Sequence, residues 1–221
     1  MNSIPKEYTS NTIYNYLKGA LLSGTYVPGD QITEIKIASQ FGTSRTPVRE
    51  AFRKLSEDGL LYINPNKSVE AVTYDKKTIG QLGIMRLQFD ILSAKLAIHY
   101  GSNSDFLKMK DLATQCCKAE SKGEHIKAIG LDADFHISLA KTSKNTFLHD
   151  MQSAIWLRTQ YILVNEEENF IGYDQRITLH FNIVDALMER NEEKTLSIIK
   201  EHILARYALT EDLPPGFIDN L

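Results

Sequence analysis

The chain has 221 residues, of which 43% are hydrophobic and 24% are charged, and its formal net charge is −3. This length allows two modest domains or one large one, each with a proper hydrophobic core, and the composition is that of an ordinary globular protein. The net charge excludes nucleic-acid binding through a bulk positive field, so such binding must rest on a local arrangement of basic side chains.

The N-terminal sequence has neither a basic segment nor an apolar run of the kind found in signal peptides, and no stretch approaches 18 uninterrupted apolar residues. The two cysteines, Cys116 and Cys117, are adjacent, so they cannot form an ordinary disulfide with each other, and they lack a metal-type CxxC spacing. We therefore expect a cytoplasmic protein that has no membrane partner.

The first expected elements are two short helices. After an arm of about eight residues, Thr9 or Ser10 can cap a helix that ends near Gly24, and a loop with a Pro-Gly turn follows. Thr33 can cap a second helix, and Gly42 stands where a helix ends in a left-handed residue. A tight turn must follow that glycine.

A third helix is predicted to end before Asp58-Gly59. Ser44 or Thr46 can cap it, and Pro47 falls in its first turn, where the missing N–H has no intrahelical partner in any case. The apolar positions form one inward stripe, at Val48, Phe52 and Leu55.

The opposite side of this third helix is basic. Arg45, Arg49 and Arg53 follow one another at intervals of one turn, and the first two lie near the N-terminal end, which docks in such motifs. Guanidinium groups at this spacing can reach guanine edges or flanking phosphates. The alternative is a solvated helix face held by ion pairs with Glu50 and Glu57.

Two short strands, 60–63 and 69–73, are expected about a PNKS turn. Residues 1–75 are thus predicted to form a winged helix-turn-helix. The core SRTPVREA and the upstream sequence Pro28-Gly29-Asp30 resemble the DNA-binding domain of the GntR family of bacterial transcription regulators.

The resemblance implies that Arg45 and Arg49 are the main base and phosphate readers. It places Thr43, Ser44 and Thr46 on the DNA backbone, and Arg53 adds charge to the same surface. The family usually carries Arg-Gly at the wing tip, where this chain has Asn66-Lys67-Ser68. Lys67 can supply charge there, but serine lacks the conformational freedom of glycine at a tight turn.

From Asp75 onward the pattern predicts an all-α antiparallel helical bundle, residues 76–213, followed by a tail, 214–221. Six helices are expected, at about 76–101, 104–121, 123–142, 145–167, 170–190 and 192–210. In the first of them an apolar stripe at helical spacing is expected to lie in the core: Leu82, Met85, Phe89, Leu92 and Leu96.

Within the helical half, Asp132 and His136 stand at i and i+4, on one side of a helix and close enough to bind one ion. A local hydrogen bond explains this pair equally well. His180 and His202 lie on later helices, and periodicity alone does not show that they converge on the pair. His99, His125 and His149 have no companion at a ligand spacing.

A second resemblance is to the FCD effector domain of the FadR-like branch of the same family, in its shorter six-helix form. It is carried by IMRLQFD (84–90), by DADFHISLAKTSKN (132–145) and by the surroundings of His180 and His202.

This resemblance implies a divalent metal ion, with zinc expected first and nickel, manganese or iron as alternatives. It implies a small organic acid bound above the metal. The implied ligands are Asp132, His136, His180 and His202, and Arg86 and Arg158 are the candidates for gripping the anion.

The expected function is a homodimeric transcription regulator, a repressor in the commoner case, that binds a pseudo-palindromic double-stranded DNA operator. A metal-dependent hydrolase is the alternative from another class, although no dedicated general base is evident. A regulator whose helical domain only dimerises is a third interpretation.

Overall fold

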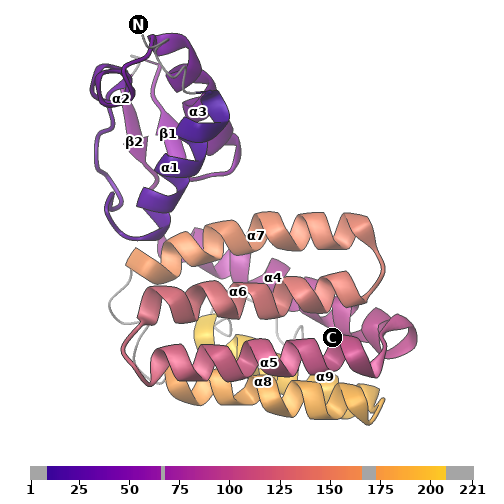
Figure 1. Cartoon of the computed structure of the whole chain (residues 1–221). Helices are drawn as coiled ribbons and strands as arrows, with labels where there is room; N and C mark the ends of the chain where they lie inside the picture. Colours follow the sequence, from indigo (N-terminus) through magenta and orange to yellow (C-terminus); the bar gives the residue numbers. More distant parts are fainter. Residues whose placement is uncertain (1–8, 66–67, 166–172, 208–221) are drawn as a thin grey trace, which may run out of the picture. The chain divides into compact units, whose positions relative to one another are not determined.

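The structure is a computed structural model that describes residues 9–65, 68–165 and 173–207, without the side chains of 173–176 and 205–207 (Figure 1). The chain forms two compact units, Met1–Tyr74 with Tyr161–Asn165, and Asp75–Gln160 with Glu166–Leu221. The predicted tail, 214–221, lies outside the described residues. No helix within the described ranges is long and apolar enough to cross a membrane.

The first unit contains three helices and a hairpin: α1 (Ser10–Leu22), α2 (Glu34–Phe41), α3 (Arg45–Glu57), β1 (Leu61–Ile63) and β2 (Val69–Ala71). The two strands are antiparallel, with Tyr62 opposite Glu70. The predicted winged helix-turn-helix is confirmed.

Local rules explain where these helices begin and end. The Thr9 side chain accepts a hydrogen bond from the Thr12 backbone N–H, and Thr33 accepts one from Lys36 in the same way. Gly42 adopts the left-handed conformation, φ 58°, that ends α2 and opens the turn to α3. The turn of the motif is therefore fixed by short-range interactions.

The segment before α2 was expected to be a plain loop, but it lies along the hairpin. Gln31 forms a bridge with Glu70, and the Ile32 N–H donates to the Val69 carbonyl at 2.8 Å. Earlier in the same segment, the Asp30 carbonyl accepts a hydrogen bond from the Ala71 N–H at 2.9 Å. These bonds tie the wing to the entry of α2.

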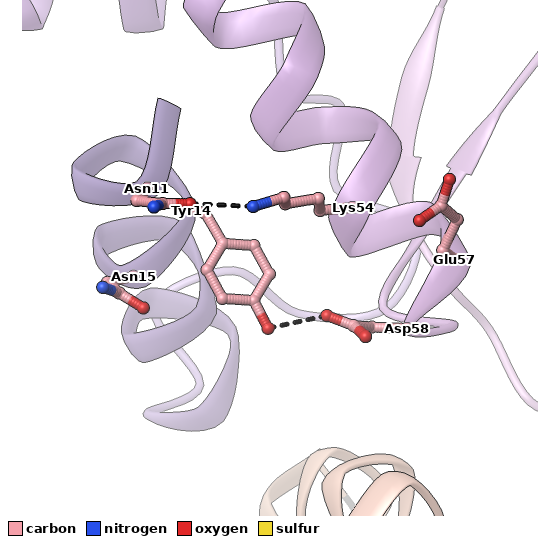
Figure 2. Close-up of a pocket in the computed structure, with 6 residues that line it drawn as sticks. All are labelled: Asn11, Tyr14, Asn15, Lys54, Glu57 and Asp58. Atoms are coloured by element: carbon pink, nitrogen blue, oxygen red, sulfur yellow. Dashed lines mark hydrogen bonds between the residues drawn. The ribbon is translucent and has the colours of Figure 1, made fainter. Parts of the chain in front are cut away.

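Polar contacts join α1 to the C-terminal half of α3 (Figure 2). The Tyr14 hydroxyl donates to Asp58 at 2.7 Å, and Lys54 donates to the Asn11 side chain at 2.8 Å. Burial raises the pKa of Tyr14, and the hydrogen bond to Asp58 raises it further. These side chains line an open cleft of about 350 Å³ between the two helices.

The second unit is a bundle of α4 (Lys76–Tyr100), α5 (Asn103–Glu120), α6 (His125–Thr142), α7 (Thr146–Asn165), α8 (Tyr173–Met188) and α9 (Glu192–Tyr207). α6 lies between α5 and α7 (Figure 1), and α4 packs against α6 and α9. This order confirms the predicted helical bundle and brings α4, α6, α8 and α9 around one core.

The apolar stripe expected to be core in α4 is only partly buried. Met85 and Leu92 are 45% and 44% exposed, so the prediction was wrong for these two residues. α4 turns a different face to the core, which carries Leu87, Ile91, Ala94 and Ala97. Periodicity shows which apolar positions share a helix face, but it cannot show whether that face meets the core of its own chain.

Gly101 ends α4 at a place where no side chain fits. A Cβ atom there would lie 2.5 Å from Thr142 Cγ2 and 2.9 Å from Phe106 Cε1. We expect Gly101→Ala to lower the free energy of unfolding by about 1–3 kcal/mol, since overpacking must displace neighbours. Chemical denaturation of the purified protein measures this loss.

Gly80, inside α4, is the matched control because a Cβ there meets nothing within 4 Å. Gly80→Ala should leave stability unchanged or raise it by up to about 1 kcal/mol through helix propensity. Equal effects of the two substitutions would contradict the steric explanation.

Candidate DNA interface and metal centre

The exposed face of α3 is a basic surface. Arg45, Arg49 and Arg53 are all exposed, whereas Val48 and Phe52 on the other side of the helix are buried. A spacing of four residues places the three guanidinium groups along one side of the helix. The structure thus offers a row of cations that fits a groove edge and its phosphates.

The N-terminal end of α3 is suited to hold a phosphate. Ser44 is the N-cap, with extended backbone angles, yet its side chain makes no capping hydrogen bond. Ser44 and Thr46 are exposed, and Thr43 is half-buried just before them. The first N–H groups of a helix lack intrahelical acceptors and attract anions, so hydroxyls and N–H groups lie together here.

Arg49 has a partner that the sequence did not reveal. Its Nε lies 2.9 Å from both carboxylate oxygens of Glu34, on α2. This hydrogen-bonded ion pair raises the pKa of Arg49. The sequence offered Glu50 as a partner of Lys54 and Glu57 as a partner of Arg53, because only neighbours along one helix can be read from spacing. The contact holds Arg49 against the neighbouring helix.

Lys67, the remaining residue expected to contact DNA, lies outside the described residues. The hairpin on either side of it is described, and the Asn64 side chain donates to Ser68 Oγ at 2.9 Å. A role for Lys67 at the wing tip stays a prediction.

In the second unit, four potential metal ligands meet from three helices. Asp132 and His136 come from α6, His180 from α8 and His202 from α9, and all four are buried. One donor atom from each residue lies within 4.8 Å of the other three. The structure therefore brings these four residues together, which their spacing in the sequence could not show.

The donor atoms surround a common point. Asp132 Oδ1 lies 3.1 Å from His180 Nε2 and 3.5 Å from His136 Nε2, and His136 Nε2 lies 3.2 Å from His202 Nε2. Ligands bound to zinc at about 2.0–2.1 Å in a tetrahedron lie roughly 3.3 Å apart. His180 Nε2 has no hydrogen-bond partner within the described ranges, although it is buried. The residues present fit a divalent ion.

The electrostatics of the cluster favour a cation. Burial raises the pKa of Asp132, but the contacts with His136 and His180 lower it by a larger amount. The pKa of Asp132 therefore lies well below its usual value. Burial also lowers the pKa of His202 and His180, which keeps these rings neutral. Burial lowers the pKa of His136 as well, yet Asp90 and Asp132 raise it by more. A positive charge is thus stabilised at this point of the fold.

Aromatic stacking fixes the imidazole rings. Phe135 stacks on His180 with 4.1 Å between centroids, and Trp156, from α7, stacks on His136 at 4.7 Å. The Arg86 guanidinium carbon lies over the Trp156 ring, 3.9 Å from the ring centroid. None of these stacking partners except Arg86 was singled out in the sequence, because their meeting depends on how α4, α6 and α7 pack.

The two arginines expected to bind an anion differ in placement. Arg86 is buried and lies over Trp156, the ring that stacks on His136. Arg158 is half-buried, and its Nη1 donates to the Ala154 carbonyl of its own helix at 3.0 Å. It stands two residues, or about 200°, beyond Trp156, so it faces away from the side that meets His136. Arg158 as an anion ligand stays a prediction.

The remaining histidines lie apart from the cluster. His99 is exposed, His125 contacts Glu120 at 2.9 Å, and His149 contacts Asp150 at 3.2 Å. Their exclusion from the ligand set agrees with the sequence interpretation.

A winged helix-turn-helix joined to a helical bundle with a buried ligand cluster defines a DNA-binding transcription regulator with a second, helical domain. Residues 9–70 match the family described as bacterial regulatory proteins, gntR family, and residues 82–205 match the FCD domain. The chain belongs to the GntR family, in the branch with an FCD C-terminal domain. This is a family of transcription regulators, not of enzymes.

Relatives match across most of the chain. The uncharacterized HTH-type transcriptional regulator YdhC of Bacillus subtilis (strain 168) is 27% identical over 198 residues, covering 88% of this chain and 85% of its own. The probable D-xylose utilization operon transcriptional repressor of Paenarthrobacter nicotinovorans is 25% identical over 93% of this chain and 92% of its own.

The crystal structure of a putative transcriptional regulator GntR from Rhodococcus sp. RHA1 has the same fold. It superimposes with a TM-score of 0.79 at 22% sequence identity, and the match covers 93% of this chain and 99% of that one.

We expect Arg49→Ala to abolish specific DNA binding at moderate salt, because a good arginine–base contact contributes about 1–3 kcal/mol of discrimination. The measurement is fluorescence anisotropy on DNA fragments that the wild type selects from a random pool. Circular dichroism and gel-filtration elution should match the wild type.

Lys54→Ala is the control, since it removes the same charge from α3 on the side that contacts Asn11. Its affinity for the selected fragments should stay within about threefold of wild type. Undiminished specific binding by Arg49→Ala would contradict the assignment of the reading surface.

Proposed function

We propose that this regulator represses transcription as a homodimer on a pseudo-palindromic operator, and that a small organic acid bound at a metal-containing pocket controls its DNA affinity. The observation that carries the proposal is the meeting of four buried donor atoms, one from each of Asp132, His136, His180 and His202, within 4.8 Å. Such a set has little structural use without a cation.

Zinc is the first candidate for the metal, because three imidazoles and one carboxylate form a typical borderline donor set. Nickel, manganese and iron accept the same ligands, so geometry alone leaves them as alternatives. When bound, the ion supplies a Lewis acid to which a carboxylate oxygen of the effector can bind.

Arg86 supports an anionic effector. Its guanidinium carbon lies over the Trp156 ring, 3.9 Å from the ring centroid. A guanidinium edge is the part that binds a carboxylate with two parallel hydrogen bonds. Trp156 also stacks on His136, so Arg86 and the ligand cluster share this neighbour, and we propose that one acid meets both the metal and the arginine.

The incompletely buried stripe of α4 supports the homodimer. Met85 and Leu92 are exposed, Phe89 between them is half-buried, and all three lie on one side of the helix. α7 adds Phe147 and Met151, which are also exposed and one turn apart. Apolar faces of this kind mark association surfaces, and a second copy of the helical domain is the expected cover.

Repression is proposed because it is the commoner outcome among such regulators and because the relative from Paenarthrobacter nicotinovorans is described as a repressor. Family membership removes the metal-dependent hydrolase from consideration. The remaining alternative is a regulator whose helical domain only dimerises and senses nothing.

The test joins metal content to effector response. Protein purified without chelator should contain about one equivalent of divalent metal per chain, and His202→Ala should contain none. In operator binding, a panel of small carboxylates and sugar acids should include at least one that weakens wild-type affinity by about 5- to 150-fold, the usual range of allosteric coupling. The chelated protein and His202→Ala should not respond to that acid.

His149→Ala is the control variant, because His149 lies outside the cluster, and it should keep both metal and response. Full operator affinity that no acid, metal or chelator alters would establish the dimerisation-only alternative. A response that persists in metal-free protein would reject the metal as part of the effector site.

The homodimer is tested with Leu92→Glu. A carboxylate placed at a buried apolar interface loses its hydration, so we expect at least a tenfold weaker dimer by sedimentation equilibrium. Leu107→Glu, at a 55% exposed position on α5, makes the same chemical change away from the stripe. Unchanged association in Leu92→Glu would place the dimer contact elsewhere.

A further inference from the structure

His136 has a carboxylate at each of its two ring nitrogens. Asp132 Oδ1 lies 3.5 Å from Nε2, on the side of the ligand cluster. Asp90 Oδ2, from α4, lies 2.9 Å from Nδ1 on the other side of the ring. Asp90 is fully buried, at 0% exposure, and it is not itself one of the four converging ligands.

Asp90 Oδ2 and the His136 Nδ1 atom lie at the distance of a hydrogen bond, 2.9 Å. Among the described residues, neither atom has any other hydrogen-bond partner. A buried carboxylate oxygen and a buried ring nitrogen at this distance are stable only if a proton lies between them. Nδ1 therefore carries a hydrogen, which leaves Nε2 as the ring nitrogen that can bind the ion.

Gln152 fixes the carboxylate. It is fully buried on α7, and its side-chain N–H group donates to Asp90 Oδ1. One oxygen of Asp90 thus meets Gln152 and the other meets His136. Trp156, one turn further along α7, stacks on the face of the same imidazole at an interplanar angle of 24°. His136 is held at its edge by Asp90 and at its face by Trp156.

The other two histidines lack such a contact. Within the described ranges, no acidic side chain lies at Nδ1 of His180 or His202, and these nitrogens have no hydrogen-bond partner. Of the three histidines, His136 alone contacts a carboxylate outside the ligand set among the residues that the structure describes. Outer carboxylates of this kind fix the tautomer of a metal-bound histidine and raise its basicity.

We propose that Asp90 is a positioning residue of the metal site: with Gln152 it holds His136 in the Nδ1–H form, so that Nε2 is ready to bind the ion. The inference rests on the metal site of the proposed function and deepens it. Asp90 acts through His136 and does not touch the metal.

The test is the zinc affinity of the full-length protein, measured by competition with a chromogenic chelator. Asp90→Asn keeps the shape of the side chain and removes its charge. We expect zinc binding to weaken by about 10- to 100-fold, the usual effect of losing an outer carboxylate. Asp134→Asn is the matched control, since Asp134 is an exposed aspartate on the same helix as His136. It should bind zinc within about twofold of wild type.

A spectroscopic readout separates positioning from a merely structural role. In zinc-loaded wild type and Asp134→Asn, ¹⁵N-labelled histidine should show the His136 Nδ1–H as a downfield, slowly exchanging proton, with zinc on Nε2. In Asp90→Asn this resonance should move upfield or exchange with solvent. Zinc bound through Nδ1 of His136 in the wild type would overturn the proposal.

The possible failures are distinguishable. If the wild type takes up no divalent metal, the metal site and the role of Asp90 fall together. If the wild type binds zinc and Asp90→Asn binds it equally, only the role of Asp90 falls. Should Asp90→Asn fail to fold, Gln152→Met decides: zinc binding at least threefold weaker supports the proposal, and unchanged binding overturns it.

Discussion

A carboxylate buried among three imidazole rings is the constraint on which the helical domain depends. Asp132 is nine-tenths or more buried and stays ionised, since its neighbours lower its pKa more than burial raises it. An isolated buried charge costs several kcal/mol, so a positive charge must lie beside it. Without a metal, protonated His136 supplies this positive charge, because its pKa is raised. A bound ion would supply the positive charge in place of the proton.

The local elements could be predicted from the sequence because short-range rules determine them. Thr33, Gly42 and Pro47 mark the ends of α2 and α3 through caps and fixed dihedrals that need no tertiary information. The four cluster residues were named only through a family resemblance. Spacing supported one pair, Asp132 and His136, and left a local hydrogen bond as an equal explanation.

What sequence could not supply is the set of contacts between distant helices. Asp90 and Gln152 are 62 residues apart, and Arg49 and Glu34 lie on different helices. Nothing in a period of 3.6 residues tells which helix faces which, so these partners were missed. The same limit explains the error on α4: an apolar stripe was assigned to the core of its own chain, although Met85 and Leu92 remain exposed.

Both sites hold their charged groups in place before any ligand arrives. Arg49 Nε donates a hydrogen bond to Glu34, and the Arg86 guanidinium lies over the Trp156 ring. Asp90 contacts His136 Nδ1. A flexible arginine loses about 2 kcal/mol of rotamer entropy when it is fixed, so a partner that fixes it during folding lowers the cost of binding later. Because residues 1–75 carry as many acidic as basic side chains, affinity for DNA cannot come from bulk charge. Preorganisation of a few guanidinium groups then matters more than their number, and the buried Arg86, which lies over Trp156, follows the same rule.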